Sequence, residues 1–212
     1  MTNDKREELE ALVQAFVDEL LEILEEAKEN STQADDKLSH RTLIELASHE
    51  GAVLEAYKDT KGVWTWGIGV TSRSGHRVER YIDNPQTLEH VFEIYEWLLR
   101  TKYLPDVLAA FRGYPLTENQ LAAALSFHYN TGAINRAMWV KSFIAGKGAQ
   151  ARREFMNWRS PPEIIPRREK ERDLFFDNVW SNKDGKITVY TDVNKPSYTP
   201  NRSSAIEMEY PL

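Results

Sequence analysis

A single stretch of strand periodicity inside an otherwise helical chain is the sequence feature that most constrains the fold. Between Ala56 and Val70 the apolar residues follow strand-like spacing, interrupted by Asp59–Gly62, whose aspartate first and glycine last suit a hairpin turn. Helical spacing prevails elsewhere, as where Thr117 and Gln120 form a capping box ahead of an Ala-rich helix to Tyr129. The pattern predicts an α+β, mostly helical protein with one small β-hairpin sheet.

Two further helices are predicted on either side of this sheet. The first begins near Thr42, because Thr42 and Glu45 form a capping box, and ends near Glu50. The second opens at Asn84-Pro85, an N-cap followed by proline at the first helical position, and runs to Leu99. A helix of that length can join two lobes, and the helix ending at Tyr129 is the best candidate for a buried core element.

Composition divides the chain into three predicted segments. Residues 1–37 form an amphipathic helix and a linker, residues 38–180 a globular domain, and residues 181–212 a C-terminal tail with a small hairpin. The first 30 residues hold ten acids and three bases. The apolar stripe of this helix consists of Leu9, Leu12, Val13, Phe16, Val17, Leu20, Leu21 and Leu24. Residues 9–24 are therefore expected either to pack on the protein's own body or to pair with a partner helix, whereas the acidic face disfavours anionic lipid.

Several classes of function are excluded by composition. The 212 residues contain no cysteine, which rules out a disulfide scaffold, a thiolate metal site and a cysteine nucleophile. No uncharged stretch is long enough to span a bilayer, so membrane insertion is not expected. The five histidines show no metal-ligand spacing, and Gly67–Gly69 lacks the third glycine of a phosphate loop. No cofactor and no metal are predicted.

The region from 136 to 172 is basic, with ten lysines and arginines against four glutamates. Such a region can attract nucleic acid, an anionic membrane or an anionic cell-wall polymer, and charge alone does not choose among them. A solvated helical surface explains the same charges equally well.

Two carboxylates and a hydroxyl lie on either side of the predicted turn. Glu50 stands at a helix end, Asp59 at the turn, and Thr65 on the returning strand. Enzymes that cleave a glycosidic bond use two carboxyl groups. One is protonated and gives its proton to the leaving oxygen, and the other is ionised and stabilises positive charge on the sugar or positions a water molecule. Spacing alone does not establish this chemistry, because such pairs are common.

The residues around these three carry a specific resemblance. Glu50, Asp59 after eight residues and Thr65 after five are embedded as HEG…AYKD..G.WT.GIG, the catalytic signature of the phage-type lysozymes, glycoside hydrolase family 24. Leu116–Leu121 with Ser126–Gly132 resembles that family's central helix and the turn after it, and Trp158 with Arg167–Phe175 its closing segment. The three matches stand in the right order and cover about residues 40 to 178.

The resemblance implies a lysozyme-like fold of two lobes around a cleft and a muramidase activity. Such an enzyme hydrolyses the β-1,4 bond between N-acetylmuramic acid and N-acetylglucosamine in bacterial peptidoglycan, with no nucleic acid as partner. Glu50 would be the general acid, Asp59 the second carboxylate and Thr65 the hydroxyl that helps to hold the attacking water. Substrate-binding positions implied in the same way are Gly67, Gly69, Phe127, Arg167 and Arg168.

Two observations refine the resemblance. Many members carry histidine after the Gly-Ile-Gly strand, whereas this chain has Val70, and the following loop to His76 also differs. The presence of Asp59 disfavours the related phage transglycosylases, which work without that carboxylate. Hydrolysis is therefore favoured.

The expected role is that of an endolysin that lyses the host cell. The start MTNDKREELE lacks the charged and apolar pattern of a signal peptide. We therefore expect the protein in the host cytoplasm, reaching the wall through a holin-type pore. The alternatives are a catalytically silent peptidoglycan-binding or virion module that docks a partner through its N-terminal helix, and a muramidase delivered by a virion or secretion device.

Overall fold

The computed structural model describes residues 12–23 and 38–210, and the chain divides into two compact units, Met1–Leu38 and Ser39–Leu212. In the first unit, residues 12–23 form a helix whose side chains are all exposed, among them Leu12, Phe16 and Leu21. The rest of the predicted N-terminal helix and linker lies outside the described residues.

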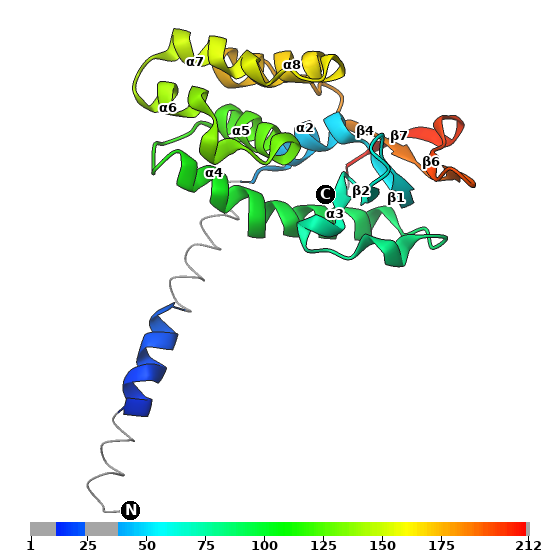
Figure 1. The fold of residues 1–212 in the computed structure, drawn as a ribbon, viewed down its shortest axis with the longest axis horizontal. Helices are drawn as coiled ribbons and strands as arrows, with labels where there is room; N and C mark the ends of the chain where they lie inside the picture. Colours follow the sequence, from blue (N-terminus) through cyan, green and yellow to red (C-terminus); the bar gives the residue numbers. More distant parts are fainter. Residues whose placement is uncertain (1–11, 24–37, 211–212) are drawn as a thin grey trace, which may run out of the picture. The chain divides into compact units, whose positions relative to one another are not determined.

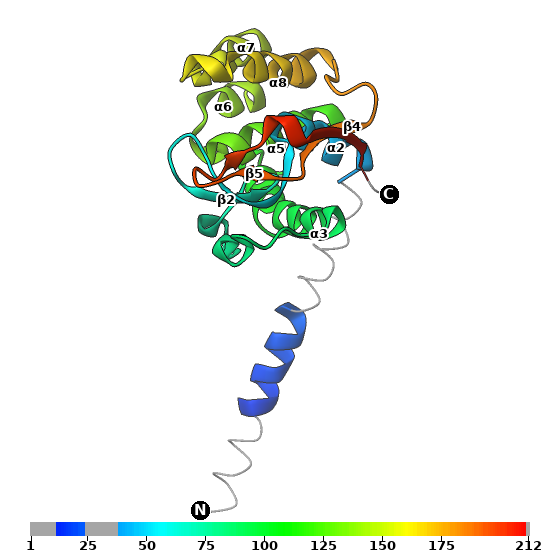
Figure 2. The same ribbon diagram turned by 90° about the vertical axis from the view of Figure 1, so that its right-hand side faces the viewer.

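The second unit combines a helical part with a sheet (Figure 1). Its α-helices are α2 (His40–Glu50), α3 (Leu88–Leu98), α4 (Leu104–Ala110), α5 (Glu118–Thr131), α6 (Met138–Ile144), α7 (Gly148–Phe155) and α8 (Ile165–Asp177). Its strands are β1 (Ala52–Lys58), β2 (Trp64–Gly67), β3 (Val70–Thr71), β4 (Lys186–Tyr190), β5 (Val193–Asn194), β6 (Thr199–Pro200) and β7 (Ala205–Glu209). Figures 1 and 2 show α5 in the middle, with α7 and α8 on one side and α3 on the other.

Helix α2 begins two residues earlier than the sequence predicts. Ser39 is the N-cap, and its Oγ accepts a hydrogen bond of 3.1 Å from the backbone N–H of Thr42. Thr42 and Glu45, predicted as a capping box, are buried inside the helix instead. The prediction was wrong because a serine three residues earlier offers the same capping oxygen.

The predicted hairpin is present as β1 and β2. Its turn is closed by a hydrogen bond of 2.9 Å from the N–H of Gly62 to the carbonyl of Asp59, and Gly62 has φ 74°. Strand β3 pairs antiparallel with β2 and completes the part of the sheet that follows α2 directly in the chain.

The helical part is built on a cluster of buried aromatic rings. Phe127 of α5 lies 5.3 Å from Trp139 of α6, and Trp139 lies 4.6 Å from Phe155 of α7, centroid to centroid. Phe175 of α8 packs against the same tryptophan at 5.0 Å. Each of these side chains is at most 1% exposed. The cluster holds α8 against α5. Helix α5, which the sequence predicted to be a buried core element, is therefore at the centre of this packing.

A continuous run of helix links the sheet to the helical part. Helix α3 is capped by Thr87, whose hydroxyl accepts from the N–H of His90, and not by Asn84 as predicted. A π-helical turn, Leu99–Tyr103, carries the chain from α3 directly into α4. Helices α3 and α4 and the turn between them therefore act as one connection between lobes.

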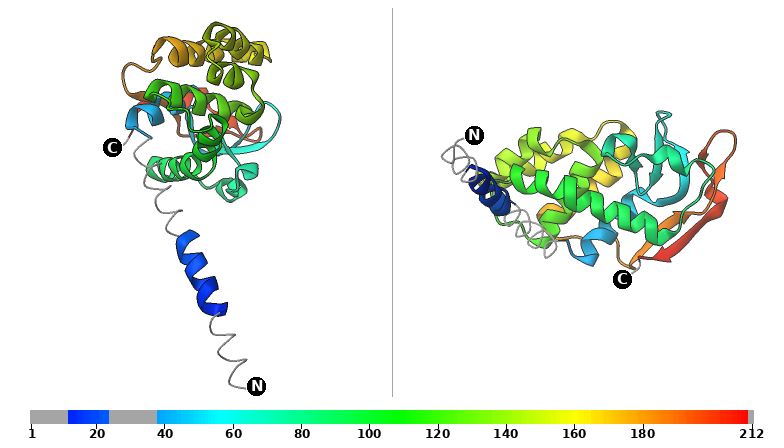
Figure 3. Two further views of the ribbon diagram at one scale, coloured as in Figure 1. Left: turned by 90° about the vertical axis from the view of Figure 1, so that its left-hand side faces the viewer. Right: turned by 90° about the horizontal axis from the view of Figure 1, so that it is seen from below.

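The C-terminal segment, predicted as a tail with a small hairpin, adds two strands to the main sheet. Strand β4 pairs parallel with β1, and β7 pairs antiparallel with β4, which gives the order β3-β2-β1-β4-β7. The short strands β5 and β6 form a separate ribbon between β4 and β7. In Figures 1 and 3 these strands lie at the end of the body away from α6 and α7.

Glu45 anchors the start of this C-terminal segment. Its carboxylate accepts hydrogen bonds from the N–H of Ser181 (3.1 Å), the Oγ of Ser181 (2.6 Å) and the N–H of Asn182 (2.9 Å). Burial by itself raises the pKa of Glu45, but these hydrogen bonds together with that from His49 outweigh it and lower the pKa below its ordinary value of 4.5.

We predict that Glu45→Gln lowers the free energy of unfolding by about 1–3 kcal/mol. The substitution replaces one carboxylate oxygen, which accepts hydrogen bonds, with an amide N–H₂ group, which cannot accept them from the backbone N–H groups of Ser181 and Asn182. The contribution of wild-type Glu45 is present above pH 4.5 and is lost as the pH falls through the lowered pKa. Urea unfolding at pH 7 and at pH 3 measures both effects. Glu169→Gln, an exposed position on α8, is the matched control; equal stability of the two variants would contradict the anchor.

Candidate active site

Glu50 is the last residue of α2, and the chain turns directly after it into β1. The turn needs Gly51, which has φ 70° and whose added Cβ would lie 3.3 Å from the carbonyl oxygen of Thr188 on β4. The Glu50 side chain is 22% exposed and forms an ion pair with the Nη1 of Arg167 from α8. A carboxylate at this position is both held and open to a ligand.

Gly69 allows the chain after β2 to approach Glu50 closely. A Cβ at this position would lie 3.2 Å from Oε2 of Glu50 and 3.3 Å from the ring of Tyr129. The hydroxyl of Tyr129 donates a hydrogen bond to the carbonyl of Ile68, which fixes this loop to α5. Gly69 therefore borders the carboxylate of Glu50.

Asp59 uses one carboxylate oxygen to build the turn between β1 and β2. Its Oδ1 accepts hydrogen bonds of 2.8 Å from the N–H groups of Lys61 and Val63. Within the described part of the chain, Oδ2 has no such partner. The turn thus fixes the carboxylate while one oxygen remains available.

Thr65 stands opposite Tyr57 in the register of β1 and β2, so the two side chains share one face of the sheet. Its hydroxyl donates to the carbonyl of Val63 at 3.1 Å, and the residue is 4% exposed. Burial and then the charges of Glu50 and Asp59 raise the pKa of Tyr57. Tyr57 therefore lies near both carboxylates, on the same face as Thr65.

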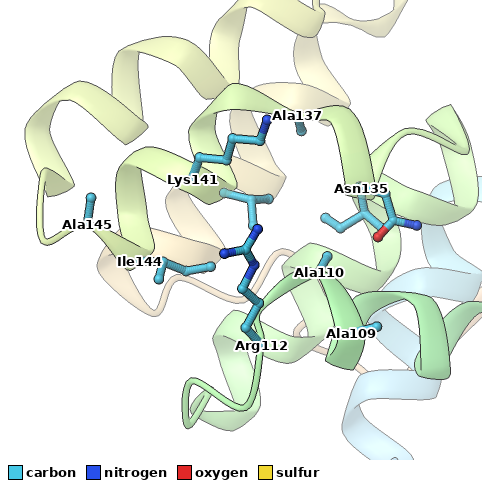
Figure 4. Close-up of a pocket in the computed structure, with 10 residues that line it drawn as sticks. Ala109, Ala110, Arg112, Asn135, Ala137, Lys141, Ile144 and Ala145 are labelled. Atoms are coloured by element: carbon cyan, nitrogen blue, oxygen red, sulfur yellow. The ribbon is translucent and has the colours of Figure 1, made fainter.

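One cavity brings the two carboxylates together. It has a volume of about 730 Å³ and lies between the hairpin and the C-terminal segment. Its lining residues are Glu50, Val53, Tyr57, Lys58, Asp59, Thr60, Tyr190, Asn194, Thr199, Pro200, Asn201, Arg202 and Ser203. Another cavity, of about 500 Å³, lies between α4 and α6 and contains neither carboxylate (Figure 4).

A buried network of charges supports Glu50 from behind. The Nε of Arg167 donates to Glu171 at 2.9 Å, Ser126 Oγ donates to the same carboxylate at 2.6 Å, and Arg168 Nη1 binds its second oxygen. Burial acts to lower the pKa of Arg167, but Glu50 and Glu171 outweigh it and raise that pKa. Two guanidinium groups therefore meet two carboxyl groups in this network.

Three of the predicted substrate-binding residues have structural roles. Phe127 and Arg168 are fully buried, and the Arg168 guanidinium lies 4.7 Å from the Phe127 ring. Helix α8 presents Arg168 to the core, where Asn130, Trp158 and Glu171 bind it. Contact of Phe127 or Arg168 with substrate stays a prediction. Gly67 is buried, and its added Cβ would lie 3.1 Å from Val91 of α3, so it serves the packing of helix on sheet.

Sequence reasoning missed four residues of the site. Tyr57 and Tyr129 border the carboxylates, and Ser126 and Glu171 complete the buried network. The spacing of Glu171, four residues after Arg167 and three after Arg168, is the signal that indicates an intrahelical charge cluster.

A family model described as phage lysozyme matches residues 47–171, which is more than half of the chain and includes Glu50, Asp59 and Thr65. The chain belongs to the phage lysozyme family. This confirms the family predicted from the sequence and makes the protein a glycoside hydrolase.

Known relatives agree with membership of this family, and a solved structure shares the fold. The endolysin of Salmonella phage P22 is 28% identical over 154 residues, covering 66% of this chain and 98% of the relative. The endolysin of Acyrthosiphon pisum secondary endosymbiont phage 1 is 32% identical over 152 residues, covering 65% and 97%. The structure of the endolysin from Escherichia coli O157:H7 phage FAHEc1, 24% identical, matches with a TM-score of 0.58 over 68% of this chain and 96% of that one. The predicted α+β lysozyme-like fold is confirmed.

Among the described residues of the lysozyme, no group of three histidine, aspartate or glutamate side chains is arranged to hold a metal ion. The helices that these residues form include none with the length and apolar character needed to cross a bilayer.

We predict that Arg168→Met lowers the free energy of unfolding of the lysozyme by about 3–5 kcal/mol, because it leaves part of a buried charge network unpaired. Thermal and urea unfolding measure the loss. Arg153→Met, at an exposed position on α7, serves as control. A raised KM at unchanged stability would instead identify Arg168 as a residue that binds substrate.

Proposed function

We propose that this lysozyme is an endolysin of the muramidase type, which hydrolyses the β-1,4 bond between N-acetylmuramic acid and N-acetylglucosamine in bacterial peptidoglycan. The single observation that carries the assignment of roles is that Glu50 and Asp59 line one cavity, each fixed by its own backbone or ion-pair contacts. Membership of the phage lysozyme family supports peptidoglycan as the substrate.

In the proposed reaction, the protonated carboxyl group of Glu50 gives a proton to the glycosidic oxygen as the bond to the anomeric carbon breaks. Positive charge then develops on the sugar ring, and ionised Asp59 stabilises it through the oxygen that the turn leaves available. A water molecule held with the help of Thr65 adds its hydroxide to the anomeric carbon, and the remaining proton of the water returns to Glu50. The net change is the addition of one water across the bond.

Arg167 is a positioning residue in this scheme. Its guanidinium binds Glu50 through one nitrogen while the others bind Glu171 and the carbonyl of Ser126, the last at 3.2 Å. Because these partners on α8 and α5 fix the planar guanidinium, Arg167 in turn fixes the position of the proposed general acid.

We further propose that the enzyme is released from the host cytoplasm through a holin-type pore and that residues 9–24 pair with a partner helix or pack on the enzyme body. The endolysin relatives support the first part, and the exposed apolar side chains of residues 12–23 support the second.

Removal of residues 1–37 tests the second part. We predict that the truncated enzyme retains its activity on purified peptidoglycan, because every proposed catalytic residue lies in the compact unit Ser39–Leu212. Loss of folding, measured by circular dichroism, would show that the helix packs on the body instead of binding a partner.

We predict that Glu50→Gln lowers the release of reducing ends from purified peptidoglycan by at least about 10²–10⁴-fold, the usual contribution of a general acid. Mass spectrometry of the products identifies hydrolysed muropeptides, and Glu169→Gln is expected to retain full activity. A folded wild-type protein that releases no reducing ends would refute the proposed function, and anhydro-sugar products would identify a transglycosylase.

A further inference from the structure

One wall of the cavity that holds Glu50 and Asp59 comes from outside the family match. Residues Asn194 and Thr199–Ser203, here called the C-terminal wall, line this cavity, whereas the phage lysozyme match ends at residue 171. The described C-terminal segment therefore closes one side of a cavity that residues 47–171 alone would leave open there.

The C-terminal wall is fixed to the β1–β2 hairpin, which carries Asp59 and Thr65. Strand β4 pairs with β1, and the N–H of Lys58 donates a hydrogen bond of 2.7 Å to the carbonyl of Tyr198. The ring of Tyr198 packs edge-on against Trp64 with centroids 5.1 Å apart, and its hydroxyl donates to Asp83 at 3.1 Å.

A buried carboxylate adds a further link. Glu55, which is 4% exposed, lies 3.2 Å from the Nζ of Lys195, and the same ammonium group pairs with Asp83. These contacts join the ribbon of β5 and β6 to β1 and to the loop before α3. The wall is thus held in place before any ligand binds, which lowers the entropic cost of binding.

Arg202 is presented from this wall on a braced turn. The Oδ1 of Asn201 accepts from the N–H of Ser203 at 3.1 Å and from its hydroxyl at 2.7 Å, and Arg202–Ser204 forms a short 3₁₀ turn. Of the two cations that line the cavity, Lys58 lies over the ring of Trp64, 5.2 Å from its centroid. Arg202 is exposed and has no ion pair or hydrogen bond from its side chain among residues 38–210.

We propose that the C-terminal wall binds the peptide stem of peptidoglycan and that Arg202 pairs with a carboxylate of that stem. This inference rests on the proposed function for the identity of the polymer. The acetylated sugars are neutral, so a guanidinium with no partner is matched best by the carboxylates of the peptide. Ionised Asp59 repels an anionic substituent, and a cation on the opposite wall offsets that repulsion.

The experiment compares one polymer in two chemical forms. Peptidoglycan is first N-acetylated, and half of it is then treated with carbodiimide and ammonia, which converts the peptide carboxylates to neutral amides. Wild type, Arg202→Gln and the control Arg153→Gln, which removes an exposed cation from α7, are assayed for reducing-end release on both forms. Binding to the insoluble polymer is measured separately by co-sedimentation in a Glu50→Gln background, so that it does not depend on turnover.

We expect Arg202→Gln to raise the KM for the carboxylate form and to weaken co-sedimentation with it by about 5-fold, the effect of one solvent-exposed ion pair. On the amidated form, Arg202→Gln and wild type should be equal, and Arg153→Gln should match wild type on both. Equal behaviour of Arg202→Gln and wild type on the carboxylate form would overturn the proposal. An equal loss on both forms would also overturn it, because Arg202 would then contact neutral groups.

The two proposals fail separately. If wild type releases no reducing ends while Arg202 still governs co-sedimentation with the carboxylate form, the muramidase function fails and the binding site stands. If wild type hydrolyses both forms and Arg202→Gln changes nothing, the function stands and the binding site fails.

Discussion

The buried network of Arg167, Arg168, Glu171 and Glu50 is the interaction on which the rest of the active site depends. Two adjacent arginines on α8 share the carboxylate of Glu171, and one of them reaches out of the core to the end of α2. Because a buried charge without its partner is costly, Arg167 needs its carboxylate partners, and its ion pair with Glu50 ties the end of α2 to α8. The position of Glu50, the proposed general acid, is thus set by the helical part.

The second carboxylate is positioned in a different and purely local way. Asp59 is held by backbone N–H groups two and four residues later in its own turn. The turn needs little from the helical part of the protein. One of the two carboxylates is therefore fixed by tertiary contacts and the other by a hairpin, and both line the same cavity.

This difference explains how much the sequence could predict. The turn at Asp59–Gly62 and the capping box of α5 rest on neighbouring residues, and both were predicted correctly. The family resemblance implied Arg167 and Arg168 alike as substrate-binding positions, because the sequence does not show which face of α8 meets the core; in the structure Arg168 is the fully buried one of the two. The pairing of β4 with β1 joins residues more than a hundred positions apart. The alternation of apolar residues within a strand indicates that it is a strand, but not which distant strand it pairs with.

The C-terminal wall also depends on the strand that leads to Asp59. The N–H of Lys58, next to Asp59, donates to the carbonyl of Tyr198 in the ribbon. Removing the ribbon would therefore free the backbone beside Asp59 and disturb catalysis and binding together. Arg202 extends from the 3₁₀ turn without a side-chain partner in the described structure, so a change there leaves this backbone contact intact. A point substitution at Arg202 separates substrate binding from catalytic geometry, whereas truncation of the segment does not.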